Sequence, residues 1–179
     1  FNEKYGEIDF IVHSIAFANR EDLGGDFSDL SKDGFTLALE TSSYSLVTIA
    51  REASKYFSKD GASVISMTFD ASTKVYPGYN VMGTAKAALE NINRQLSAQF
   101  GPNKTRFNSI SAGPLPSLSA RSIPGFTEMR KAHEERSPIK RPITHEEVAN
   151  TALFLISDMS SGITGSIIPV DGGYGIIAL

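Results

Sequence analysis

The sequence of 179 residues contains no cysteine. This absence excludes a disulfide framework and any metal site built on thiolates, and it fits a reducing compartment. No apolar run approaches the length of a membrane-spanning helix. The first six residues also lack the basic and apolar regions of a signal peptide. We therefore predict a cytoplasmic location without a membrane partner.

The chain also lacks an excess of basic residues. It has 17 Lys and Arg against 20 Asp and Glu, a net charge of −3, whereas nucleic-acid binders usually carry a basic patch. We therefore predict no nucleic-acid partner. The histidines His133 and His145 lie in charged segments without a partner at ligand spacing. We expect both on the surface, and no metal site.

Apolar runs alternate with segments of helical periodicity along the chain. Buried parallel strands are predicted at residues 8–13, 61–68, 106–110 and 167–170, the first of them buried on both faces. Helices are predicted within 30–57, as a short and a long helix, at 79–100, at 126–136, and after a capping box at Thr144. This alternation predicts an α/β fold, a doubly wound parallel sheet of Rossmann type with helices on both faces.

Ligands of such sheets bind outside the carboxyl ends of the strands. The predicted strands end in polar or Gly-containing segments at residues 13–16, 68–70 and 111–114. Tyr79 begins the helix after the second of these strands. We expect all four places to converge on one edge of the sheet.

Tyr79 and Lys86 are seven residues apart on one predicted helix. Seven residues make nearly two turns, so both side chains share a face. A cation on the same face lowers the pKa of a tyrosine, and the pair could donate a proton or a hydrogen bond to a carbonyl that becomes an enolate. A tyrosine at the core edge beside a solvated lysine gives the same spacing. Spacing alone favours that structural interpretation.

The segment 79–90, Tyr-Asn-Val-Met-Gly-Thr-Ala-Lys-Ala-Ala-Leu-Glu, resembles the Tyr-x6-Lys signature of enoyl-acyl-carrier-protein reductases. These enzymes form a divergent branch of the short-chain dehydrogenase/reductases. The Tyr-x3-Lys signature of the ordinary branch would need a lysine where this chain has Gly83. Segments 12–18, 42–45, 110–114 and 170–173 also match the family, in its order. The resemblance therefore covers nearly the whole chain.

The resemblance implies reduction of trans-2-enoyl thioesters on acyl carrier protein in fatty-acid biosynthesis. The cofactor would be NADH or NADPH, with NADH favoured, and it would supply the hydride. Tyr79 would stabilise the enolate by a hydrogen bond, and Lys86 would hold the nicotinamide ribose. In the superfamily that the chain resembles, helices like those within 30–57 and 79–100, which carry much apolar surface, pair across two-fold axes. The resemblance therefore implies a homo-oligomer, a dimer or a tetramer.

Further site positions carry over from the resemblance. The expected cofactor-binding residues are Ser14, Ile15, Thr68, Lys86, Gly113, Pro114, Leu115 and Ser117. The expected substrate-binding residues are Ala18, Leu23, Phe69, Tyr79, Met82, Ile123 and Phe126. An apolar lining suits a fatty acyl chain, although core packing explains each Leu, Ile or Met equally well. Phe69 stands where many bacterial members have a second Tyr. Because it cannot form a hydrogen bond, it can only shape the pocket or gate substrate entry.

Residues 115–136 resemble the substrate lid of the family, and the Ser and Pro content of this segment fits a mobile element. The Gly-rich turn that holds the pyrophosphate, and the residue that selects NAD over NADP, belong to a first strand–helix unit that we do not find here. We therefore expect residues 1–179 to be the C-terminal part of one Rossmann-type reductase domain that lacks its N-terminal βα units.

Two other functions are compatible with parts of this pattern. A catalytically incompetent fragment or pseudoenzyme would keep only the fold and the oligomer surface, and the missing Gly-rich turn supports this alternative. An ordinary short-chain alcohol dehydrogenase or ketoreductase is opposed by the Tyr-x6-Lys spacing.

Overall fold

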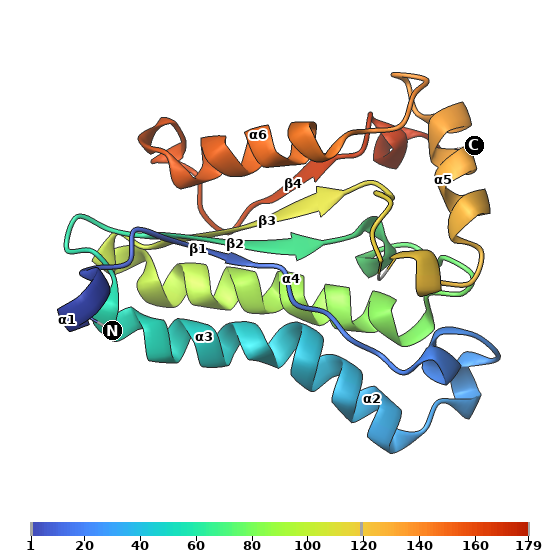
Figure 1. Ribbon diagram of the computed structural model, residues 1–179, viewed down its shortest axis with the longest axis horizontal. Coiled ribbons are helices and arrows are strands. Elements are labelled where there is room, and N and C mark those ends of the chain that lie inside the picture. Colours follow the sequence, from blue (N-terminus) through green and yellow to red (C-terminus); the bar gives the residue numbers. More distant parts are fainter. Residues whose placement is uncertain (1, 119, 179) are drawn as a thin grey trace.

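The computed structural model describes residues 2–118 and 120–178. Its four strands form one parallel sheet in the order β1-β2-β3-β4. The strands are β1 (Phe10–His13), β2 (Ser63–Thr68), β3 (Arg106–Ala112) and β4 (Ile167–Val170). All four lie where the apolar runs predicted them. Because the strands are parallel, their carboxyl ends meet at one edge, as the arrowheads in Figure 1 show.

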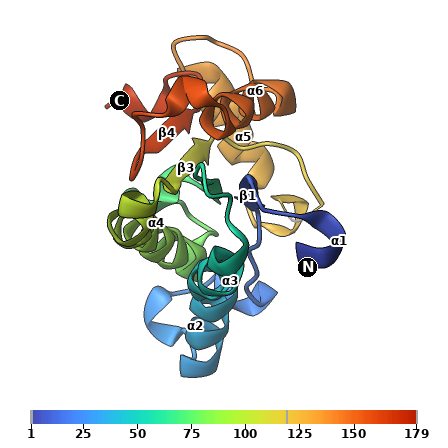
Figure 2. The ribbon, with the colours of Figure 1, turned by 90° about the vertical axis from the view of Figure 1, so that its left-hand side faces the viewer.

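Helices cover both faces of this sheet, which confirms the predicted doubly wound α/β architecture. The helices are α1 (Asn2–Tyr5), α2 (Lys32–Leu39), α3 (Ser45–Ala53), α4 (Asn80–Phe100), α5 (Phe126–Arg136) and α6 (His145–Ile156). Figure 2 shows α2, α3 and α4 on one side of the sheet and α5 and α6 on the other. Within residues 2–118 and 120–178, no helix is both long and apolar enough to cross a membrane.

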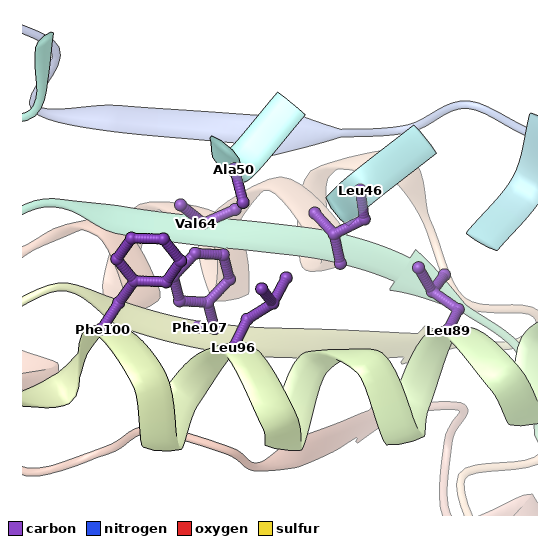
Figure 3. Close-up of a cluster of buried hydrophobic side chains, with 7 residues drawn as sticks. All are labelled: Leu46, Ala50, Val64, Leu89, Leu96, Phe100 and Phe107. Atoms are coloured by element: carbon purple, nitrogen blue, oxygen red, sulfur yellow. The ribbon is translucent and has the colours of Figure 1, made fainter. Parts of the chain in front are cut away.

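The main core lies between the sheet and the helices α3 and α4. Figure 3 shows its buried side chains: Leu46, Ala50, Val64, Leu89, Leu96, Phe100 and Phe107. Burial of each large apolar side chain contributes about 1.5–3 kcal/mol. Helix α4 supplies three of these residues at helical spacing, and this apolar face fixes the helix rotation. The same rotation decides where Tyr79 and Lys86 point.

Helix α2 continues into α3 through a π-helical stretch, Glu40–Tyr44. The predicted short and long helices are therefore two pieces of similar length joined without a break. Ser42 and Ser43 of this stretch are buried, and the Ser43 hydroxyl donates a hydrogen bond to the Ala85 carbonyl over 2.7 Å. Short π-helical insertions often occur near functional sites. This one fixes α4 at the residue before Lys86.

Strand β1 is one of the two edge strands within the described residues, the other being β4. Its Phe10 and Val12 side chains are 51% and 47% exposed, so the prediction that this strand is buried on both faces is wrong. Ile11 packs against the main core, and His13 is buried. An apolar run indicates that a strand can be covered on both faces, but it does not supply the elements that cover it.

Candidate active site

The polar ends of the strands meet at a cavity of about 490 Å³. The cavity lies at the carboxyl edge of the sheet, where the expected convergence of residues 13–16, 68–70 and 111–114 was predicted. Eleven of the expected site residues line it: Ser14, Thr68, Phe69, Tyr79, Lys86, Gly113, Pro114, Leu115, Ser117, Ile123 and Phe126. The structure therefore brings most of the sequence-predicted site together.

The other four expected site residues lie outside the cavity wall. Leu23 and Met82 belong to a second buried cluster together with Phe69 and Tyr79, and Ala18 packs against that cluster. Ile15 is 44% exposed. In the described structure Ala18, Leu23 and Met82 support the aromatic wall from behind.

Tyr79 is the residue that precedes the first turn of α4, and its side chain is 9% exposed. Its phenol makes no hydrogen bond with any described residue. Burial raises the pKa of Tyr79 to about 12. The expectation that Lys86 lowers this pKa is therefore wrong, because removal of the phenol from water dominates. At neutral pH the phenol keeps its proton and can donate it in a hydrogen bond.

Lys86 is buried on the same side of α4. Lys86 is 6% exposed. Its ammonium group donates a hydrogen bond to the Met67 carbonyl over 2.8 Å. Burial lowers the pKa of Lys86 to about 8, while the nearby Glu90 carboxylate opposes the shift. An ammonium has three donors, so the hydrogen bond to Met67 leaves two for a ligand in the cavity.

Glu90 is a buried neighbour of the cavity residues Thr68 and Lys86 that the sequence did not reveal. It lies one turn after Lys86 on α4 and is 6% exposed. The Thr68 hydroxyl donates a hydrogen bond to its carboxylate over 2.8 Å. The sequence signal was the i,i+4 spacing from Lys86, but only the buried environment makes that spacing matter.

His13 lies near enough to Lys86 to feel its charge, but its side chain contacts Ser45 of α3. It is 1% exposed, and its Nε2 lies 2.8 Å from the Ser45 hydroxyl. Burial lowers its pKa, and the charge of Lys86 lowers it further. This neutral ring holds β1 to α3 beside the buried cation.

Helix α6 forms a wall of the cavity that the sequence did not reveal. Its contributions are His145, Val148, Ala149 and Ala152, and Met129 of α5 adds another apolar side chain. The predicted capping box at its start is present, with the Glu147 amide donating to the Thr144 hydroxyl over 3.2 Å. The capping box predicted where α6 begins. Which side chains of α6 face the cavity depends on how this helix packs on the sheet.

Residues of the expected lid, 115–136, line the cavity at the carboxyl edge of the sheet, although Ser119 is outside the described residues. The carbonyl oxygen of Pro124 sits so close to Gly78 that a Cβ there would collide with it. Gly78 also has a φ of +81°, which favours glycine. The lid therefore touches the loop that leads into Tyr79.

His133 is not on the surface, so that prediction is wrong. It is 5% exposed, and its ring stacks on Tyr174 with centroids 3.6 Å apart. Burial lowers its pKa to about 4. The charged neighbours of His133 along the chain concealed that α5 turns this one side chain inward. His145 is exposed, as expected, although it borders the cavity.

The described residues contain no group of three His, Asp or Glu side chains placed to hold a metal ion.

A family model described as enoyl-(acyl carrier protein) reductase matches residues 1–175. The chain is 46% identical over 177 residues to an NADH-dependent enoyl-[acyl-carrier-protein] reductase of Synechocystis, covering 99% of this chain and 68% of the relative. It is 48% identical over 169 residues to the NADPH-dependent reductase of Staphylococcus aureus, covering 94% and 66%. The chain thus spans about two thirds of the length of these relatives.

Solved structures agree with this result. The Bacillus cereus enoyl-acyl carrier protein reductase with NADP+ and an indole naphthyridinone superimposes with a TM-score of 0.96 at 44% identity, over 99% of this chain and 69% of the other. The reductase of Anaplasma phagocytophilum in complex with NAD gives a TM-score of 0.94 at 35% identity, over 99% and 68%.

Proposed function

The chain belongs to the enoyl-(acyl carrier protein) reductase family, and from this premise we propose that it reduces trans-2-enoyl thioesters on acyl carrier protein in fatty-acid biosynthesis. The electron donor is NADH or NADPH, since relatives of both kinds match the chain. The observation that carries the proposal is the cavity at the carboxyl edge, where Tyr79 and Lys86 meet the lid. The alternative of an incompetent fragment has less support, because Tyr79, Lys86 and nine further expected site residues line the cavity.

Tyr79 is the residue to which we assign stabilisation of the enolate. The nicotinamide supplies a hydride when bound, and the thioester oxygen then gains negative charge. A neutral phenol with a pKa of about 12 donates a hydrogen bond to that oxygen without losing its proton first. A donor preorganised in a buried site costs little reorganisation, which is why such groups are effective.

Lys86 is the residue to which we assign the hold on the cofactor ribose. Its ammonium keeps two donors beyond the hydrogen bond to Met67, and two donors suit a pair of neighbouring hydroxyls. Glu90 acts on it as a positioning residue. Its carboxylate raises the pKa of Lys86 against the effect of burial, and so keeps the lysine charged near neutral pH.

The described residues fit the nicotinamide end of the cofactor. Ser14, Thr68, Gly113, Pro114, Leu115 and Ser117 bound the cavity beside Lys86, and Ile15 follows Ser14 along the chain. We assign these residues to the cofactor. A Gly-rich turn for the pyrophosphate is not found within residues 1–179, so tight binding needs a segment that supplies it. NADH remains the favoured donor.

We assign the apolar part of the cavity to the acyl chain. Phe69, Ile123, Phe126 and Met129 form its wall, and an apolar wall excludes water from the reacting carbons. The residues Ala18, Leu23 and Met82 back this wall and set its position. A cytoplasmic location and a dimeric or tetrameric assembly complete the proposal.

The experiment is an assay of NADH and NADPH oxidation with a trans-2-enoyl thioester and with a ketone as competing substrates. It is run on this chain and on a form extended at its N-terminus by a Gly-rich strand–turn–helix unit. We expect the extended form to reduce the enoyl thioester and not the ketone. Reduction of the ketone alone would identify an ordinary ketoreductase, and failure on both substrates would support the pseudoenzyme.

A further inference from the structure

Helix α5 has a mostly charged sequence and a single buried residue, His133. Phe126 and Met129 of the same helix line the cavity. These three positions are three and four residues apart, so they lie along one face of the helix. Whatever holds His133 therefore also sets the position of the cavity wall that α5 contributes.

Three segments that are distant in sequence meet at His133. Its Nε2 lies 3.2 Å from the hydroxyl oxygen of Tyr76, in the loop between β2 and α4. Its ring stacks on Tyr174, in the segment after β4, at an interplanar angle of 14°. Figure 1 shows α5 beside the C-terminal segment at the carboxyl end of the sheet.

The protonation state of Asp70 sets the direction of the hydrogen bonds that join Asp70, Tyr76 and His133. Asp70 pairs with Lys74 over 2.9 Å, so it acts as a carboxylate, which can only accept. The Tyr76 hydroxyl lies 3.1 Å from the same Asp70 oxygen and must give its hydrogen to it. His133 therefore carries its proton on Nε2 and donates it to the Tyr76 oxygen.

The other ring nitrogen of His133 explains why this histidine is neutral. Its Nδ1 is buried and has no partner among the described residues. A second proton would leave a buried N–H without an acceptor, which costs more than an unused lone pair. Burial accordingly lowers the pKa of His133 to about 4, with Asp171 and Asp70 opposing the shift and Lys74 adding to it.

Other aromatic and charged groups lie around the His133 ring and contribute to its electrostatic environment. Tyr174 covers one side of it, and the Arg136 guanidinium lies 5.9 Å from the Tyr174 ring centre. The Lys74 ammonium lies 5.7 Å from that same centre. Burial and Asp70 raise the pKa of Tyr76, so its hydroxyl stays protonated with His133 neutral.

Phe69 connects this contact to the catalytic tyrosine. Its ring centre lies 4.7 Å from that of Tyr76, 5.2 Å from that of Tyr79 and 6.3 Å from that of His133. Phe69 lines the cavity but has no polar group of its own to fix it. Its place is set by the aromatic rings around it.

We propose that Tyr76 and His133 are positioning residues of the reduction, and that their hydrogen bond holds the lid helix α5 against the loop that carries Phe69 and Tyr79. This inference rests on the proposed function. The contact shapes the wall that meets the acyl chain and leaves Lys86 untouched. Its loss should weaken substrate binding while cofactor binding is preserved.

The test uses Tyr76→Phe, His133→Phe and the double variant, in the form of the protein that is active in the assay above. Both phenylalanines keep an aromatic ring and remove the hydrogen bond. His133→Phe also removes the second ring nitrogen, so the effect common to the two single variants is the one that reports the hydrogen bond. We expect each single variant to raise KM for the enoyl thioester about 3- to 10-fold, the factor for one buried hydrogen bond. The double variant should be no worse than either single one, with kcat and the cofactor KM within about twofold of the parent.

Glu135→Gln is the matched control, because it removes only the exposed ion pair with Lys131 on α5 and should change neither KM. Effects that simply add in the double variant would overturn the proposal. So would a parallel loss of kcat, cofactor affinity and substrate affinity, which is the result expected from general destabilisation.

Hydrogen exchange gives a second measurement that needs no activity. Without substrate, amides of residues 126–136 should exchange about 3- to 10-fold faster in both single variants, while those of 80–100 should not change. Unchanged exchange in 126–136 would overturn the contact as a hold on α5. If the parent protein fails to reduce enoyl thioesters, the proposed function is wrong, and exchange still decides whether the contact holds the helix.

Discussion

Helices α4 and α5 line the same cavity but are held by different contacts. Ten of the 21 residues of α4 are buried, against one of the 11 residues of α5. Helix α4 packs along the sheet through Leu89, Leu96 and Phe100. Helix α5 depends on His133 and a few half-buried side chains. The proposed catalytic groups therefore lie on α4 or directly before it. Phe126 and Met129 of the substrate wall lie on α5, whose opening should cost less free energy because fewer of its side chains are buried.

The largest expected effect tests whether side chains of α4 contribute more to folding stability than side chains of α5. Leu89→Ala should lower the free energy of unfolding by about 2–5 kcal/mol, since Leu89 is fully buried. Met129→Ala on α5 should cost less stability but raise KM for the enoyl thioester, because Met129 lines the cavity. Urea denaturation and steady-state kinetics measure the two. Equal losses of stability would remove the distinction between the helices.

The next effect concerns the chemistry assigned to α4. Tyr79→Phe should lower kcat about 10²- to 10³-fold, the usual cost of one donor to a developing oxyanion, and leave the cofactor Kd nearly unchanged. Lys86→Met should instead weaken cofactor binding. Stopped-flow turnover and cofactor fluorescence titration separate the two properties. If both variants lose both properties equally, the assignment of separate roles is wrong.

A smaller effect concerns the contact that holds α5. The folded-state pKa of His133 is about 4, below its usual 6.5, so the unfolded chain takes up the proton first as the pH falls. The resulting loss of stability begins near pH 6.5 and grows until about pH 4. At pH 5 it amounts to at most about 2 kcal/mol.

Urea denaturation at pH 7 and pH 5 measures this loss, with His133→Phe as the comparison. The variant lacks the titrating group and should lose about 2 kcal/mol less between the two pH values. An identical pH dependence in both proteins would mean that His133 does not stay neutral in the fold.

The smallest effect concerns the charge of Lys86. Glu90→Gln removes the carboxylate that raises the pKa of Lys86, so this pKa should fall further below its value of about 8. The pH above which the cofactor KM rises should then move down by about half a unit to one unit. Glu52→Gln, at an exposed site that does not line the cavity, should leave the profile unchanged. An unshifted profile in Glu90→Gln would contradict the proposal that Glu90 keeps Lys86 charged.

The elements of the fold were accessible from the sequence because each depends on local periodicity. The strands, helices α4 and α5, and the capping box at Thr144 were predicted within a few residues of their observed bounds. The convergence of the strand ends was also predictable, because parallel strands leave no other geometry. The spacing of Tyr79 and Lys86 did not by itself predict a catalytic pair. That prediction needed the other segments of the chain that match the family.

The errors have one physical cause. Burial of His133, the raised pKa of Tyr79 and the exposure of Phe10 depend on which elements surround each side chain. Periodicity predicts which residues share a face, but not what covers that face. The α6 wall and Glu90 were missed for the same reason.

The sequence by itself determined the parallel α/β architecture, the family and the helix that carries Tyr79 and Lys86, because each follows from residues near one another along the chain. Only the tertiary structure decided that Tyr79 is buried with a raised pKa, that Glu90 lies beside Lys86, and that His133 contacts Tyr76 and Tyr174. These properties depend on desolvation and on contacts between residues as far apart as Tyr76 and His133, which local sequence patterns do not contain.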